Sequence, residues 1–133
     1  IMIEQKEATV IFEETEPVYV GADEFKIEEV VTNYTSNALN HLDGERKVEI
    51  KVIQESDCVK VTVFNTGTPI PEEDIPNLWN KFYKVDKART REYGGSGIGL
   101  SIVKAIIEGM NQKYGVCNYD NGVEFWFTLD CRQ

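Results

Sequence analysis

The chain has 133 residues, of which 41% are apolar and 28% are charged, and this composition is typical of one water-soluble globular domain. No apolar run approaches the roughly 20 residues that a membrane helix needs, and the net charge of −9 argues against general binding to nucleic acid. The three cysteines are widely spaced and form no C-x-x-C pair, which argues against a disulfide framework or a zinc site and favours a reducing compartment.

The first third of the chain predicts two short strands and a helix. The segments EATVIFEE (7–14) and PVYVGADE (17–24) have an extended, strand-like composition. A helical pattern follows and runs to residue 42, with Asp23 as its N-cap. Apolar residues at helical spacing are expected to form its buried stripe, namely Phe25, Val30, Tyr34, Ala38 and Leu42.

The rest of the chain predicts two hairpins with helices between them. Residues 47–55 and 58–65 have the pattern of paired strands, and an Asn-Gly turn at Asn121–Gly122 indicates a closing hairpin. A short helix is expected around Glu72–Phe82 and a longer one over Ile98–Met110. This order predicts an α/β fold, a two-layer sandwich whose mixed, mostly antiparallel sheet packs against three helices. The apolar face of the last helix would comprise Ile98, Ile102, Val103, Ile106 and Ile107.

The segment EYGGSGIGLSIVKAIIEG (92–109) places four glycines within six residues, directly before a helical pattern. Because glycines add conformational entropy to the unfolded chain, such a cluster indicates a tight bend or a close approach of the backbone to a ligand. The N-terminus of the following helix would suit a phosphate, although a flexible connector is the alternative. Five basic residues lie just before the glycines, either on a solvated face or beside a phosphate, namely Lys81, Lys84, Lys87, Arg89 and Arg91.

Asparagines recur on one side of the first predicted helix. Asn33 and Asn37 lie four residues apart, and Asn40 and His41 follow one turn later. Asparagine is a poor helix former, so either this is an ordinary exposed face or its amides are used. Neutral amide oxygens in a row could lie under a nucleotide, and one of them could coordinate Mg²⁺. His41, the only histidine, could be a surface residue, a ring packed on a base, or a phosphoacceptor.

Four segments occur in the order and spacing of the conserved boxes of a known domain. They are NYTSNALNH (33–41), VFNTGTPIP (63–71), LWNKFYKVD (78–86) and GGSGIGLSIVKAI (94–106). Together they resemble the ATP-binding domain of sensor histidine kinases, whose Bergerat-type fold is shared with type II topoisomerases, Hsp90-type chaperones and mismatch-repair ATPases. The resemblance spans about Asp23 to Leu129. It implies that 1–133 is one catalytic domain excised from a longer kinase, with a mobile ATP lid at about 68–97.

The resemblance also assigns site residues. It implies that Asn37 coordinates Mg²⁺ with Asn33 as its upstream partner. It further implies that Lys84 and Arg91 offset negative charge on the transferred phosphoryl group, so these two and Asn37 are the expected catalytic residues. The other expected nucleotide-binding residues are Asn40, His41, Asn65, Gly67, Ile70, Phe82, Tyr83, Gly95, Ser96, Gly97, Ile98, Gly99 and Leu100.

Three positions depart from the family pattern. Asn65 replaces the aspartate that accepts a hydrogen bond from adenine, which predicts an ATP affinity lower by around tenfold. Since an amide can rotate and donate to guanine, weaker discrimination against GTP is also predicted, and Asn65→Asp should reverse both effects. Pro69 replaces a glycine and stiffens the near hinge of the lid, and Asn40 replaces a cation near the phosphates.

The resemblance implies that the domain binds Mg-ATP and donates the γ-phosphoryl group to a histidine on a separate dimerisation domain. ATP-hydrolysing relatives and anti-sigma-factor serine kinases carry a glutamate base where this chain has Asn33, which cannot accept a proton. The implied partners are ATP, the phosphoacceptor domain of the same kinase and, indirectly, a response regulator. The isolated domain is expected to be monomeric and cytoplasmic, and its parent a homodimer anchored in the bacterial plasma membrane. A nucleotide-sensing module without catalysis is the alternative, and a serine kinase is a less favoured one.

Overall fold

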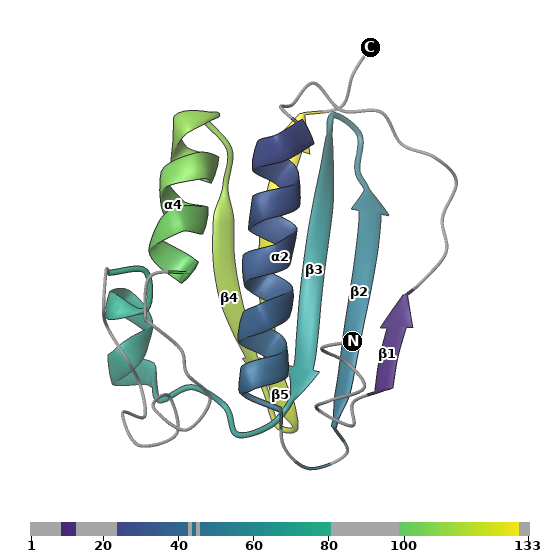
Figure 1. Cartoon of the computed structure of the whole chain (residues 1–133), viewed down its shortest axis with the longest axis vertical. Coiled ribbons are helices and arrows are strands. Elements are labelled where there is room, and N and C mark those ends of the chain that lie inside the picture. The colour runs from purple at the N-terminus through teal and green to yellow at the C-terminus, as the bar shows by residue number, and fades with distance from the viewer. Residues whose placement is uncertain (1–8, 13–23, 43, 45, 81–98, 131–133) are drawn as a thin grey trace.

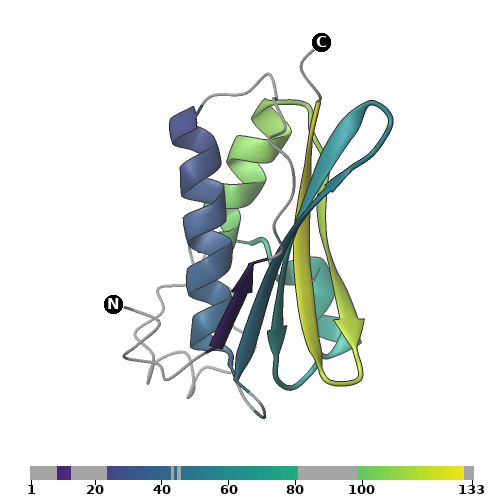
Figure 2. The same cartoon turned by 90° about the vertical axis from the view of Figure 1, so that its right-hand side faces the viewer.

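The computed structural model describes residues 9–12, 24–42, 44, 46–80 and 99–130, which form two layers. One layer is a five-stranded sheet. The other contains the helices α2 (Glu24–Asn40) and α4 (Gly99–Gly109), which lie side by side on one face of the sheet, as Figures 1 and 2 show. Among the described helices, none has the length and apolar character needed to cross a membrane.

The strands confirm the predicted sheet. Their order is β1-β2-β3-β5-β4, in which β1 and β2 are parallel and all other neighbours are antiparallel. The expected strand over 17–24 lies outside the described residues, apart from Glu24, which begins α2. The short helix expected around Glu72–Phe82 is a 3₁₀ helix, η1 (Glu72–Asn77), and Phe82 lies outside the described residues. The strands are β1 (Thr9–Phe12), β2 (Lys47–Gln54), β3 (Cys58–Thr66), β4 (Tyr114–Tyr119) and β5 (Gly122–Asp130).

Tyr34 is at the centre of the core between the two layers. Its side chain is 0% exposed, and its hydroxyl donates a hydrogen bond of 3.0 Å to the backbone carbonyl oxygen of Trp126. This bond satisfies the one polar atom of a ring that packs against Trp79, Phe125 and Phe127. Burial raises the pKa of Tyr34 well above its usual value, so the hydroxyl stays protonated. Tyr34 thereby joins α2 to the middle of β5.

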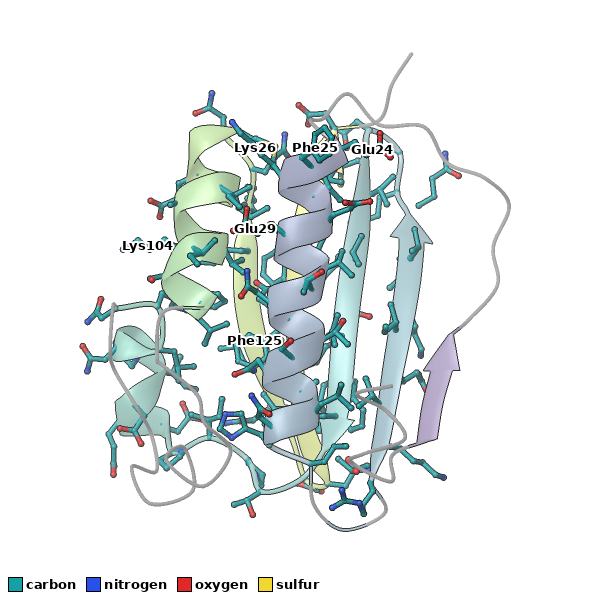
Figure 3. The ribbon with its side chains drawn as sticks, in the orientation of Figure 1. Glu24, Phe25, Lys26, Glu29, Lys104 and Phe125 are labelled. Atoms are coloured by element: carbon teal, nitrogen blue, oxygen red, sulfur yellow. The ribbon has the colours of Figure 1, made fainter. Side chains whose placement is uncertain are left out.

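The buried stripe of α2 is confirmed for Val30, Tyr34 and Ala38, but the prediction for Phe25 was wrong. Phe25 is 81% exposed and lies beside Glu24 and Lys26 at the N-terminal end of α2 (Figure 3). The reason is helical geometry, because five residues at about 100° each place Phe25 about 140° away from Val30 around the helix. Leu42 is buried as expected, although it lies just beyond the end of the helix.

In α4, Val103 and Ile107 are buried as predicted, and Ile106 packs against the core from a half-buried position. Ile102 is half-buried and does not belong to the core cluster, while Ile98 lies outside the described residues. The buried face of α4 is therefore centred on Val103 and Ile107, which lie about one turn apart.

The closing hairpin is confirmed, but its turn is shifted by one residue. Tyr119 pairs with Gly122, so the two turn residues are Asp120 and Asn121 instead of Asn121 and Gly122. Gly122 is already the first residue of β5, and a Cβ atom there would collide with the backbone carbonyl oxygen of Asn65 on β3. The glycine is therefore required by the close approach of two strands, and its place next to an asparagine misled the sequence prediction.

Candidate functional site

The first and last conserved boxes meet where α2 faces the beginning of α4. The Asn33 side chain donates a hydrogen bond of 2.9 Å from Nδ2 to the backbone carbonyl oxygen of Glu29. Its other amide atom, Oδ1, faces α4, where a Cβ atom built on Gly99 would lie only 3.0 Å away. Glycine as the first residue of α4 therefore lets the helix approach Asn33 closely. Leu100 follows and packs against the core from a half-buried position.

The other polar residues expected on α2 lie in its last two turns. The side chains of Asn37 and Asn40 are half-buried, as that of Asn33 is. His41 follows the end of the helix, and its backbone N–H donates to the carbonyl oxygen of Asn37 over 3.2 Å. No basic residue occurs in the last turn of α2, so this end of the helix supplies amides and one imidazole.

Asn65 connects the end of β3 to the end of α2. Its side chain is 2% exposed, and Nδ2 donates to the backbone carbonyl oxygens of His41, over 3.4 Å, and Thr66, over 3.2 Å. Rotation of this amide would turn Oδ1 towards two carbonyl oxygens. The two hydrogen bonds therefore oppose the rotation on which the expected loss of discrimination against GTP depends.

We expect Asn65→Asp to lower the free energy of unfolding by about 1–3 kcal/mol, because a buried carboxylate would face the two carbonyl oxygens that now accept hydrogen bonds. In contrast to the sequence-based expectation, the ratio of ATP to GTP affinity should change little, because Oδ1 is already held as an acceptor. Denaturant unfolding and competition binding would measure both effects. Asn121→Asp, at an exposed turn position, is the matched control. If Asn65→Asp had the stability of the wild type and a higher ratio of ATP to GTP affinity, this account would be contradicted.

The hairpin formed by β4 and β5 supports the chain that follows Asn65. The backbone N–H of Gly67 donates to the carbonyl oxygen of Asn121 over 3.0 Å. Ile70 donates from its backbone N–H to Asn118 Oδ1 over 3.0 Å, and its carbonyl oxygen accepts from Asn118 Nδ2 over 2.8 Å. The turn of this hairpin lies at the same end of the sheet as the last turn of α2 (Figure 1). Sequence reasoning missed Asn118, because its partner is 48 residues away and it belongs to no conserved box.

Four side chains between residues 70 and 79, which the sequence assigned to the beginning of the lid, pack on the core. Ile70 and Ile75 contact the core cluster, and Leu78 is part of it. The Trp79 ring makes edge-on contacts with the rings of Tyr34, Tyr114 and Phe125. The remaining expected site residues lie outside the described part of the chain, namely Phe82, Tyr83, Lys84, Arg91, Gly95, Ser96, Gly97 and Ile98.

The donor atoms around α2 fit a metal ion that arrives with a nucleotide. Within the described residues, no group of three or more histidine, cysteine, aspartate or glutamate side chains could hold a metal. Mg²⁺ prefers oxygen ligands, keeps several waters and is commonly shared between one or two protein groups and phosphates. A neutral amide such as that of Asn37 can supply one such oxygen, so nucleotide phosphates and water would have to supply the others.

Comparison with known proteins gives a consistent result. The family model described as histidine kinase-, DNA gyrase B-, and HSP90-like ATPase matches residues 22–133. Sensor protein kinase WalK of Staphylococcus saprophyticus is 33% identical over 120 residues, covering 88% of this chain and 20% of the relative. Sensor histidine kinase WalK of Bacillus subtilis is 39% identical over 93 residues, covering 68% of this chain and 15% of the relative. The chain thus spans about a fifth or less of the length of these relatives.

Solved structures agree with the sequence matches. The nucleotide-free catalytic domain of histidine kinase ThkA superimposes with a TM-score of 0.84 at 32% identity, covering 96% of this chain and 82% of that domain. ThkA in complex with the response regulator protein TrrA superimposes with a TM-score of 0.80 at 30% identity, covering 98% of this chain and 36% of the ThkA chain. The α/β sandwich expected from the sequence is therefore confirmed.

Proposed function

The chain belongs to the histidine kinase-, DNA gyrase B- and HSP90-like ATPase family, and from this we propose that it binds Mg-ATP and donates the γ-phosphoryl group to a histidine on a separate dimerisation domain. Its sequence relatives are sensor histidine kinases, so its role is that of their ATP-binding catalytic domain. The observation that carries the proposal is the approach of Gly99 to Asn33, which sets the N-terminus of α4 against this asparagine of α2. Such a terminus offers N–H groups to a phosphate.

Asn33 supports transfer to histidine over hydrolysis or transfer to serine. Water and serine hydroxyls need a general base, and an amide cannot take up their proton. Asn33 already uses Nδ2 on the Glu29 carbonyl oxygen, and its Oδ1 lies against α4. A neutral imidazole is nucleophilic without such a base. An anti-sigma-factor type of serine kinase is therefore disfavoured.

The residues of the site would act by positioning and by offsetting charge, which is what phosphoryl transfer requires. Asn37 would hold Mg²⁺, which neutralises phosphate charge when it is bound with the nucleotide. Lys84 and Arg91 would face the transferred group, and Asn65 would accept a hydrogen bond from adenine. We propose an ATP lid within about 68–97, and the packing of Ile75, Leu78 and Trp79 on the core supports a beginning after Trp79 instead of at Thr68.

The wider assembly is also a proposal. The parent kinase would be a homodimer that pairs this domain with a helical phosphoacceptor domain and passes the phosphoryl group to a response regulator. We also propose that the parent is anchored in the plasma membrane, with this domain on the cytoplasmic side. A nucleotide-sensing module that binds ATP without transfer is the second candidate, and the experiment below separates the two.

The proposal is tested by titrating the chain with ATP by isothermal calorimetry, with Mg²⁺ and with EDTA, and then by transfer to a separately produced acceptor domain. We expect magnesium-dependent binding, followed by an acid-labile phosphate on the acceptor histidine. Binding without transfer would favour the nucleotide-sensing module. Absence of ATP binding would contradict both candidates.

We expect no phosphorylation of His41, the only histidine in the chain. Its backbone carbonyl oxygen accepts a hydrogen bond from Asn65, so it belongs to the adenine side of the proposed site, away from the γ-phosphoryl group. The chain would be incubated with labelled Mg-ATP without an acceptor domain, and acid-labile phosphate would be measured. His41→Gln is the control for background labelling. Label that is present in the wild type and lost in His41→Gln would refute this prediction.

A further inference from the structure

We propose that Asn118 is a positioning residue for nucleotide binding, which holds the Ile70 backbone in place and thereby sets the wall of the site next to Asn65. The inference rests on the function proposed above. It concerns a side chain on β4 that lies outside all four conserved boxes, and it begins from the two hydrogen bonds between Asn118 and Ile70.

The Asn118 amide binds both backbone groups of one residue. Oδ1 accepts from the Ile70 N–H over 3.0 Å, and Nδ2 donates to the Ile70 carbonyl oxygen over 2.8 Å. Both bonds are partly buried. In extended backbone the N–H and C=O of one residue point to the same side, so a planar amide can satisfy both, as a neighbouring strand would.

The residues on either side of Ile70 limit the backbone donors of this segment. Pro69 and Pro71 flank Ile70 and have no N–H, so Ile70 carries the only backbone donor among these three residues. A residue that precedes proline is also restricted to extended geometry, which suits the arrangement. Asn118 therefore accepts from the only backbone N–H that residues 69–71 carry.

The same hairpin holds the preceding residues. Gly122 packs its backbone against the Asn65 carbonyl oxygen, and the Asn121 carbonyl oxygen accepts from Gly67. The end of the β4–β5 hairpin thus contacts the chain at residues 65, 67 and 70. The Ile70 side chain contacts the core, and Leu78 and Trp79 anchor the segment downstream. Loss of the Asn118 contacts would therefore loosen the Ile70 backbone at the wall of the site, while these core contacts keep the fold intact.

The experiment compares Asn118→Ala with Asn121→Ala in the same chain. Asn121 is an exposed residue of the same hairpin, and its contact with Gly67 uses only the backbone, so its replacement should retain that bond. Amide hydrogen exchange at Ile70, the dissociation constant of Mg-ATP and the melting temperature are measured for each. For Asn118→Ala we expect faster Ile70 exchange and ATP affinity weakened about five- to tenfold, with little change in melting temperature. Asn121→Ala should resemble the wild type.

Asn118→Asp provides a second readout that a merely structural role would not produce. Its carboxylate lacks the donor for the Ile70 carbonyl oxygen, but the protonated acid has both a donor and an acceptor. ATP affinity relative to the wild type at the same pH should therefore recover as the pH falls towards about 4–5, near the usual carboxyl pKa, and Asn118→Ala should show no recovery.

The inference would be overturned if Asn118→Ala bound ATP within twofold of the wild-type affinity. It would also be overturned if the loss of ATP affinity only followed a fall in melting temperature. Failure of the wild type to bind Mg-ATP would instead refute the proposed function.

Discussion

Replacing Asn37 with alanine is expected to abolish magnesium-dependent ATP binding while the domain remains folded. Asn37 is half-buried one turn beyond Asn33, and it lies off the buried stripe of Val30, Tyr34 and Ala38. Its removal would delete the only protein oxygen proposed for Mg²⁺. We expect a loss of ATP affinity on the order of 100-fold, equivalent to about 2.7 kcal/mol. Calorimetry with and without Mg²⁺ would measure the loss.

Two further variants make the Asn37 result specific. Asn37→Asp should also lose ATP binding, because a carboxylate would repel the phosphates in the absence of a well-placed metal. Thr32→Ala, at an exposed position of the same helix, should bind ATP as the wild type does. Circular dichroism melting should give similar temperatures for all three variants. If ATP binding by Asn37→Ala still depended on magnesium, Asn37 would not be the metal ligand.

The second large effect is expected for Gly122→Ala. A Cβ atom at this position would collide with the Asn65 carbonyl oxygen and would lie 2.7 Å from the ring of Phe64. Because the carbonyl belongs to a paired central strand, it cannot move away without breaking the sheet pairing of β3 with β5. Overpacking of this kind destabilises proteins by about 1–3 kcal/mol, and we expect the upper end of that range because the obstacle is backbone. Denaturant unfolding would measure it.

The same substitution at Gly109 is the matched control. A Cβ atom there meets nothing within 4 Å, and Gly109 is the last residue of α4. Since alanine favours helix more than glycine, Gly109→Ala should leave stability unchanged or raise it by up to about 1 kcal/mol. Equal stability of the two variants would show that β3 and β5 do not approach as closely as Gly122 indicates. ATP binding by Gly122→Ala should also weaken, because Asn65 would be displaced.

Local patterns in the sequence were sufficient for most of the elements and for the family. The spacing of Val30, Tyr34 and Ala38 correctly located the buried stripe of α2, and the alternating segments located β2 and β3. These features depend on the period of a single helix or strand, which neighbouring residues specify. The four boxes indicated the ATPase family for the same reason, because each of them is contiguous. The glycine box suggested a close approach of the backbone to a ligand, which stays a prediction; within the described residues, Gly99 lies close to Asn33.

What the sequence left open concerns contacts between residues that are far apart along the chain. The error at Phe25 is of a different kind, because helical spacing alone places this residue about 140° away from Val30 around α2 and leaves it exposed. Gly122 had the neighbours of a turn glycine, yet the approach of Asn65 from another strand explains it. Asn118 holds Ile70 across 48 residues, and no local pattern records such a pair. These contacts arise only when the sheet has assembled, because pairing of β3, β5 and β4 brings the separate segments to one end of the molecule.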